Sequence, residues 1–407
     1  MEIHDSVQKR HEEMTGWRRE LHSRPELAFQ EKWTSDFVAE KLESFGLPIH
    51  RGLAGTGVVA TLKNGEGPSI GLRADMDALP LLEKNQFGHR SQNEGKMHAC
   101  GHDGHTTMLL GAASVLAESP SFRGTVHFIF QPAEEGGGGG NVMVKEGLFE
   151  KFPVDAVYGM HNWPGMEPGE IGVHNGPVLA ANDAFDLEIQ GKGGHAAMPD
   201  LCIDPILAAS QVVSALQSVV SRGINPVDSA VVTVTQIHAG DAYNVIPDSV
   251  KLCGSIRTFK KEVREKVISS MESVVKGVAS GLGASAELRI KQGYPATINT
   301  AQEAQKAASA AARVVGETKV ILDADPSTGS EDFAYMLQAR PGCYIWLGNG
   351  NRDGGCMLHN PHYDFNDEIL PIGTSYWVSL VEQEPVSYTH LRAHETPEHL
   401  GCRLEGE

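Results

Sequence analysis

The sequence contains no apolar run that approaches the roughly 20 residues a membrane-spanning helix requires. Residues 1–5 (MEIHD) show no basic stretch followed by an apolar one, so we expect a cytoplasmic protein with no membrane partner. Basic side chains are also in deficit, since 34 Lys and Arg stand against 52 Asp and Glu, a formal net charge of −18. This deficit argues against nucleic acid as a partner. It still allows a small anionic substrate, because a local basic pocket can form in an acidic protein.

Cysteine is scarce, and its spacing shows no pairs. The six cysteines are Cys100, Cys202, Cys253, Cys343, Cys356 and Cys402. In a reducing compartment this pattern predicts free thiols rather than a disulfide framework. Cys253 and Cys343 lie in apolar, strand-like runs and are expected to be small core residues. Cys100 differs, because its neighbours are polar and rich in histidine.

The length and the pattern of apolar residues predict two domains. A chain of 407 residues is too long for one simple core. Strand-like runs alternate with helical ones before residue 182 and after residue 297, which predicts a mainly parallel α/β sheet. Between them, residues 183–296 read as β-α-β-β-α-β, the order of a ferredoxin-like α+β unit. We therefore expect a discontinuous α/β domain (1–182 and 297–382), an inserted α+β domain (183–296) and a disordered or artefactual tail (383–407).

Two adjacent carboxylates follow one of the expected buried strands. Residues 125–130 are β-branched and aromatic, and QPAEEG (131–136) comes directly after them. Neighbouring carboxylates such as Glu134 and Glu135 repel unless a cation or proton lies between them. Asp75, Asp77 and His161 also follow expected strands. Ligands collect at the carboxyl ends of parallel strands, so this placement predicts a shared site.

A second unusual stretch, MHACGHDGH (97–105), puts a thiol, three imidazoles and a carboxylate within nine residues. Cys100 and His102 can point to one centre, and thiolate, imidazole and carboxylate together suit Zn²⁺, Mn²⁺, Ni²⁺ or Co²⁺. The alternative is a buried thiol beside a helix cap at Asp103. Neither His161 nor His359 would carry the metal interpretation alone, because single histidines at strand ends are usually satisfied core or surface residues.

The pair of glutamates has a chemical interpretation at such a centre. One carboxylate can bind metal while the other accepts a proton from water, whose pKa a metal ion lowers to about 7. The alternative is an acidic surface loop. The glycines that follow, residues 136–140, would let the backbone approach a ligand closely, or would form a flexible loop.

The inserted segment supplies further candidates. His195, in GKGGHAAMP (191–199), could donate to the oxyanion of a tetrahedral intermediate, or be an ordinary turn residue. Asn244 and Arg257 could hold a substrate carboxylate, which arginine does with two hydrogen bonds. Their alternatives are a turn amide and a surface salt bridge.

Together these motifs resemble those of the M20 metallopeptidase family, in particular its amidohydrolase branch. The resemblance spans about residues 17–380 and rests on LRADMDALP (72–80), MHACGHDGH (97–105), QPAEE (131–135), GMHN (159–162), GHA (194–196), YNVIP (243–247) and LHN (358–360). It implies a dinuclear site whose ligands are Cys100, His102, Glu135, His161 and His359. It also implies Glu134 as general base, with Asp75 or Asp77 as a supporting carboxylate. A departure from the family pattern is Ser330, where relatives usually carry alanine; we expect it to affect packing near the substrate pocket.

The resemblance further implies that residues 1–182 and 297–382 form the catalytic domain and that residues 183–296 form a lid domain that mediates dimerisation. It implies that His195 reaches the active site of its own subunit or of its partner. We therefore expect a homodimeric, metal-dependent amidohydrolase that cleaves N-acyl or N-aroyl amino acids such as hippurate. Alternatives with the same chemistry are a dipeptidase, an aminoacylase or an N-acetyl-diaminopimelate deacetylase-type enzyme. A closed structural metal site or a redox sensor built on Cys100 would be different classes of protein.

Overall fold

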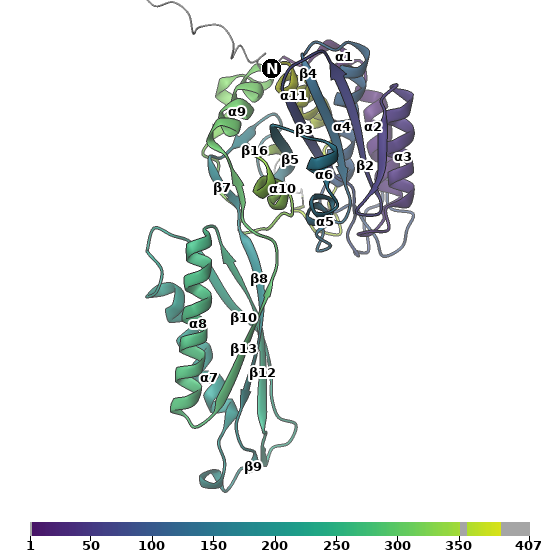
Figure 1. Ribbon diagram of the computed structural model, residues 1–407. Helices are drawn as coiled ribbons and strands as arrows, with labels where there is room; N and C mark the ends of the chain where they lie inside the picture. The colour runs from purple at the N-terminus through teal and green to yellow at the C-terminus, as the bar shows by residue number, and fades with distance from the viewer. Residues whose placement is uncertain (1, 351–355, 384–407) are drawn as a thin grey trace, which may run out of the picture.

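The computed structural model describes residues 2–350 and 356–383. The expected tail lies almost entirely outside these residues, since the last described helix, α11 (Leu370–Gln383), ends where the tail begins. Figure 1 shows a large α/β part joined to a narrower part by extended segments near β8. The fold is therefore the predicted α/β architecture with an inserted α+β domain.

The large part is built on an eight-stranded sheet with the order β1-β2-β4-β3-β5-β16-β6-β15. The central strands β4, β3, β5 and β16 run parallel. Strand β2 pairs antiparallel with both β1 and β4, and β6 pairs antiparallel with β16 but parallel with β15. The strand bounds are β1 (Ile49–Leu53), β2 (Gly57–Asn64), β3 (Ser69–Asp75), β4 (Gly124–Gln131), β5 (Ala156–Pro164), β6 (Ile171–Val173), β15 (Val320–Leu322) and β16 (Gly342–Gly350). A small pair, β7 (Gly176–Leu179) and β14 (Thr297–Asn299), lies beside it.

Helices cover both faces of this sheet because its strands are apolar on both sides. Val126 and Phe128 of β4 pack into one core cluster, whereas Ile129 packs into another. The first face is covered by α1 (Asp5–Gln8), α2 (His11–Ser23), α3 (Lys32–Ser44), α4 (His102–Glu118), α9 (Ala301–Val315) and α11. The second is covered by the short helices α5 (Gly139–Lys145), α6 (Leu148–Lys151) and α10 (Ala334–Ala339).

The inserted domain is a four-stranded antiparallel sheet with the order β10-β12-β8-β13, packed against two helices (Figure 1). Its elements are β8 (Ala181–Gln190), α7 (Pro205–Ser221), β10 (Ala230–His238), β12 (Ser249–Thr258), α8 (Lys261–Gly281) and β13 (Ser285–Gln292). This order of elements matches the predicted ferredoxin-like unit. The domain has its own hydrophobic cluster, which supports our proposed bounds of 183–296. Beyond its sheet lies a hairpin-like pair, β9 (Gly194–His195) and β11 (Val245–Ile246), which we call the lid tip.

Two helix starts differ from the sequence prediction. The residue pattern predicts a helix over 106–117, but the helix begins at His102, because Gly101 takes a left-handed conformation (φ 95°) that turns the chain into it. The pattern also predicts a helix over 331–338, but this helix begins at Ala334. Glu331 is not helical because its carboxylate accepts the backbone N–H of Phe333 at 2.9 Å and also binds other partners. Short 3₁₀ turns at Pro199–Leu201, Glu317–Lys319 and Asp367–Ile369 complete the described elements.

Candidate metal centre and active site

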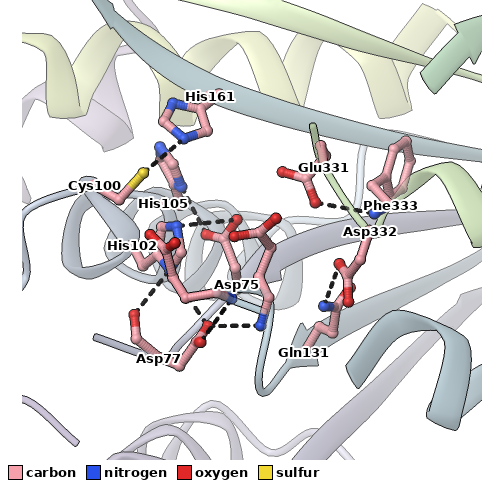
Figure 2. Close-up of polar contacts among 12 residues, drawn as sticks. Asp75, Asp77, Cys100, His102, His105, Gln131, His161, Glu331, Asp332 and Phe333 are labelled. Atoms are coloured by element: carbon pink, nitrogen blue, oxygen red, sulfur yellow. Dashed lines mark hydrogen bonds and ion pairs between the residues drawn. The ribbon is translucent and has the colours of Figure 1, made fainter. Parts of the chain in front are cut away.

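The expected metal ligands come together at the carboxyl edge of the central strands. Cys100 and His102 lie at the start of α4, His161 lies on β5, and Glu135 follows β4. In Figure 2 the side chains of Cys100 and His161 point toward each other, with Sγ and Nε2 3.3 Å apart. His359 reaches the same place from a loop after β16, with its Nε2 3.2 Å from Oε1 of Glu135. Residues that are up to 259 positions apart in the chain thus share one site.

These ligands form two overlapping groups, and Cys100 belongs to both. One group is Cys100, His102 and His161; the other is Cys100, Glu135 and His359, and within each group the potential ligand atoms lie within 4.8 Å of one another. Cys100 could therefore contribute its sulfur to either group of donors.

The two buried histidines are oriented by hydrogen bonds on the side away from the sulfur. Nδ1 of His102 donates to the backbone carbonyl of Asp77 at 2.8 Å, and Nδ1 of His161 donates to that of Asn162 at 2.7 Å. Each ring therefore directs Nε2 toward the cluster, as metal-binding histidines usually do. Nε2 of His102 is buried without a hydrogen-bond partner among the described residues. Such an orphaned atom fits a bound cation.

The charges of the site also fit a cation. Burial opposes the charged imidazolium, but the carboxylates of Asp75 and Asp77 still raise the pKa of His102 to about 10. Burial, followed by the charges of Glu135 and Glu134, raises the pKa of Cys100 well above its ordinary value. In this surrounding the thiol keeps its proton unless a metal ion replaces it, which argues against the redox-sensor interpretation.

The two aspartates that follow β3 have different partners. Asp77 accepts the backbone N–H groups of Glu134 and Glu135 at 2.9 and 3.0 Å, so its carboxylate fixes the loop that bears both glutamates. Asp75 contacts Nδ1 of His105 at 2.7 Å and accepts from Arg73 at 2.8 Å. Neither aspartate belongs to the two groups that share Cys100. Both instead hold residues that surround the centre.

Glu134 lies among other carboxylates. It is buried, and a carboxylate oxygen of each of Glu134, Glu331 and Asp332 falls within 4.8 Å of the others. Burial, followed by the charges of Glu331 and Glu135, raises the pKa of Glu134 well above its ordinary range. The guanidinium of Arg73 holds the other two, at 2.9 Å from Glu331 and 3.1 Å from Asp332.

A cavity of about 450 Å³ opens onto these groups. Its walls include Cys100, Glu134 and His161, the cationic side chain of Arg257, and the side chains of Trp163 and Trp346. The two indole rings lie 4.2 Å apart between centroids. An accessible cavity beside the ligands argues against a closed structural metal site.

Within one chain, the structure brings Arg257 but not His195 or Asn244 to this cavity. His195 and Asn244 are exposed neighbours at the lid tip, where the N–H of Ala196 donates to the carbonyl of Asn244 at 3.0 Å. Figure 1 places β9 at the far end of the inserted domain from the large sheet. Asn244 and Arg257, the residues expected to hold a substrate carboxylate, therefore do not line the same cavity within a single chain.

Several supporting residues lay inside the quoted motifs but were not predicted as site residues. His105 bridges Asp75 and Asn162, with Nε2 2.8 Å from Oδ1 of Asn162. Arg73 and Glu331 bind each other behind Glu134. The sequence signal for His105 was its place in the MHACGHDGH stretch. The only sequence signal for Glu331 was that it forms an acidic pair with Asp332, directly after Gly329 and Ser330.

The family match decides what kind of protein uses this site. Residues 71–383 match the model of peptidase family M20/M25/M40. The chain belongs to this family. An N-acetylcysteine deacetylase of Bacillus subtilis (strain 168) is 41% identical over 378 residues, covering 91% of this chain and 96% of the relative. A hippurate hydrolase of Campylobacter jejuni is 40% identical over 364 residues, covering 89% and 94%.

A solved M20 structure has the same fold. The Bacillus subtilis YXEP protein, described as a dinuclear metal binding peptidase, superposes with a TM-score of 0.81 at 37% identity, covering 92% of this chain and 98% of that one. The present M20 protein is accordingly a hydrolytic enzyme of the amidohydrolase type. None of its described helices has the length and apolar character to cross a membrane.

Proposed function

We propose that this M20 enzyme hydrolyses the amide bond of N-acyl or N-aroyl amino acids, releasing a carboxylic acid and a free amino acid. The observation that carries the proposal is a single cavity lined by both acidic or metal-binding residue types and a cationic one. Glu134 and candidate metal ligands line this cavity, and so does the cationic side chain of Arg257. Such a cavity suits a substrate with a scissile amide and an anionic group.

Cys100, His102 and His161 would hold one divalent ion, and Cys100, Glu135 and His359 the other, with zinc, manganese, nickel or cobalt compatible with these donors. When bound, such ions supply positive charge that polarises a carbonyl and acidifies water. The hydrogen bonds described above hold His102, His161 and Glu135 in the positions from which they would bind these ions.

Glu134 is suited to move the proton. Its carboxylate would accept a proton from the attacking water and deliver it to the nitrogen of the breaking C–N bond, so that the amine leaves neutral. The burial and the neighbouring carboxylates that raise its pKa favour the form that has accepted the proton. Asp77 holds the backbone of Glu134 through the 2.9 Å bond and thereby fixes the position of this base.

Arg257 is suited to bind the carboxylate of the amino-acid part. Among the described residues its guanidinium has no hydrogen-bond or ion-pair partner, although the charge of Asp183 acts on it. The printed names of the relatives point the same way, because hippurate and N-acetylcysteine differ in the acyl group but both carry an amino-acid carboxylate. Trp163 and Trp346 offer an aromatic surface for the acyl group.

We also propose a cytoplasmic homodimer in which His195 completes the site of the partner subunit. The lid tip is exposed and bears apolar side chains, with Tyr243 fully exposed and Met198 and Val245 each 52% exposed. Apolar groups gathered beside an exposed histidine fit a protein contact better than open solvent.

The test is hydrolysis of a panel of hippurate, N-acetylcysteine, N-acetyl amino acids and dipeptides by the wild type and Glu134→Gln. We expect wild-type turnover of acylated amino acids that a chelator abolishes. The glutamine variant should retain its metal, because Glu134 is not a ligand in the proposed pair of sites, but lose roughly 10²–10⁴-fold in kcat. Preferred cleavage of dipeptides would favour the dipeptidase alternative, and full activity of the variant would refute the role of Glu134.

A further inference from the structure

The loop that bears Glu134 is held by a tyrosine from the junction between the two domains. The hydroxyl of Tyr294 donates to the backbone carbonyl of Glu134 at 2.7 Å and accepts the backbone N–H of Gly138 at 2.9 Å. One oxygen thus joins two points of the chain that are four residues apart. Tyr294 also lines the cavity.

The hydroxyl of Tyr294 adds to the bonds that this loop makes within itself, where the N–H of Gly136 donates to the carbonyl of Glu134 at 2.7 Å. Between β4 and α5 the backbone passes through left-handed conformations at Ala133 (φ 57°), Gly136 (φ 82°) and Gly138 (φ 68°). No regular strand or helix fixes residues 134–138, and Tyr294 is the partner of the Gly138 N–H among the described residues. The side-chain position of Glu134 depends on this backbone, together with the bonds from Asp77.

Tyr294 is itself fixed where the chain leaves the inserted domain. Its backbone N–H donates to Oδ1 of Asn182 at 2.6 Å, and its carbonyl accepts the N–H of Asn182 at 3.1 Å. Asn182 is the cross-strand partner of Arg257. A short path of bonded neighbours therefore joins the proposed carboxylate-binding arginine to the loop of the proposed base.

We propose that Tyr294 is a positioning residue that holds the Glu134–Gly138 loop in the geometry needed for proton transfer and ties that geometry to the junction with the inserted domain. The inference rests on the proposed role of Glu134 as base. The phenol acts through the backbone of the loop and not on the substrate. Burial, followed by the charges of Asp332 and Glu134, raises the pKa of Tyr294 so that its hydroxyl remains a donor throughout the working pH range.

The test compares Tyr294→Phe with Tyr335→Phe in the metal-loaded enzyme. Tyr335 is a matched control, because its ring packs edge-on against Tyr294 (6.1 Å between centroids), while its hydroxyl faces the carbonyl of Gly293 at 3.5 Å rather than the loop. For Tyr294→Phe we expect kcat to fall roughly tenfold to a hundredfold with KM nearly unchanged. Hydrogen exchange at the amides of residues 134–138 should become about tenfold faster, because the Gly138 N–H loses its partner. Tyr335→Phe should match the wild type in both measurements.

The outcomes separate this inference from the proposed function. The inference on Tyr294 would be overturned if Tyr294→Phe kept the wild-type kcat and the wild-type rate of hydrogen exchange at residues 134–138. It would also be overturned if only KM rose, because the hydroxyl would then contact the substrate. An equal loss in both phenylalanine variants would overturn the inference too, because the effect would then not be specific to the hydroxyl that bonds the loop. If the wild type hydrolyses none of the panel, the proposed function fails, while the exchange measurement still decides whether Tyr294 holds the loop.

Discussion

His127, on β4 and away from the candidate metal centre, shows how one residue sets part of the pH dependence of stability. It is buried, and burial lowers its pKa to about 4. Its Nδ1 lies 2.9 Å from Oγ1 of Thr61, and the ring also bonds the backbone of Pro153, so the neutral ring is satisfied. Unfolding exposes the ring to water, where its pKa returns to about 6.5.

The sign of the effect follows from this shift. Between pH 6.5 and 4 the unfolded chain binds a proton at His127 that the folded chain does not, so the stabilising contribution is complete above pH 6.5 and is lost as the pH falls toward 4. We expect the wild type to lose about 1–3 kcal/mol more free energy of unfolding than His127→Gln between pH 7 and 4.5. Urea unfolding of both chelator-treated proteins at the two pH values measures this difference. Equal losses would contradict the assignment of this pH dependence to His127.

At this scale the sequence identified the ligand types but not their geometry. Cys100, His102, Glu135, His161 and His359 could be nominated because thiols, imidazoles and carboxylates in polar clusters are uncommon without a function. The orientation of His102 and His161 could not be predicted, because it depends on backbone carbonyls that any residue could supply. The role of Tyr294 could likewise not be predicted from the sequence, because a tyrosine after a strand has many ordinary roles.

Among the elements, the start of helix α4 is the one whose packing most directly affects the site. Gly104 lies two residues after His102, and a Cβ added there would fall 2.2 Å from the ring of Phe365. Phe365 belongs to the segment that follows His359. Gly104→Ala must therefore push apart two elements that each carry a ligand.

We expect Gly104→Ala to lower the free energy of unfolding by about 1–3 kcal/mol through overpacking and to weaken metal binding. Thermal unfolding and metal analysis after dialysis check both effects. Gly277→Ala is the matched control, because Gly277 lies in the exposed part of helix α8 with nothing within 4 Å of its added Cβ. That change should be neutral or stabilising by about 0.4–1 kcal/mol. Equal thermal unfolding and metal content of the two variants would show that the site of Gly104 can accommodate a Cβ atom.

Most elements could be predicted because their patterns are strong. The long helix α7 has the bounds expected from the sequence, helped by Asp204, whose side chain accepts the N–H groups of Ile206 and Leu207 at its start. The element order of the inserted domain was equally clear, because β8 alternates between buried and exposed residues along its length. The sequence could not show the distance between segments, such as that between the lid tip beside Asn244 and the cavity that Arg257 lines.

For the whole molecule, the separation of His195 from Glu134 in one chain leads to a decisive mixing experiment. Glu134→Gln and His195→Ala subunits are each expected to be inactive alone and are mixed in equal amounts, with exchange of subunits allowed. If His195 serves the partner, a mixed dimer contains one site with both native residues, so random pairing restores about a quarter of wild-type activity. If His195 serves its own chain, every site lacks one of the two residues and the mixture stays inactive. Sedimentation of the mixture confirms that dimers were present, and an inactive mixture of such dimers would contradict the proposed role of His195.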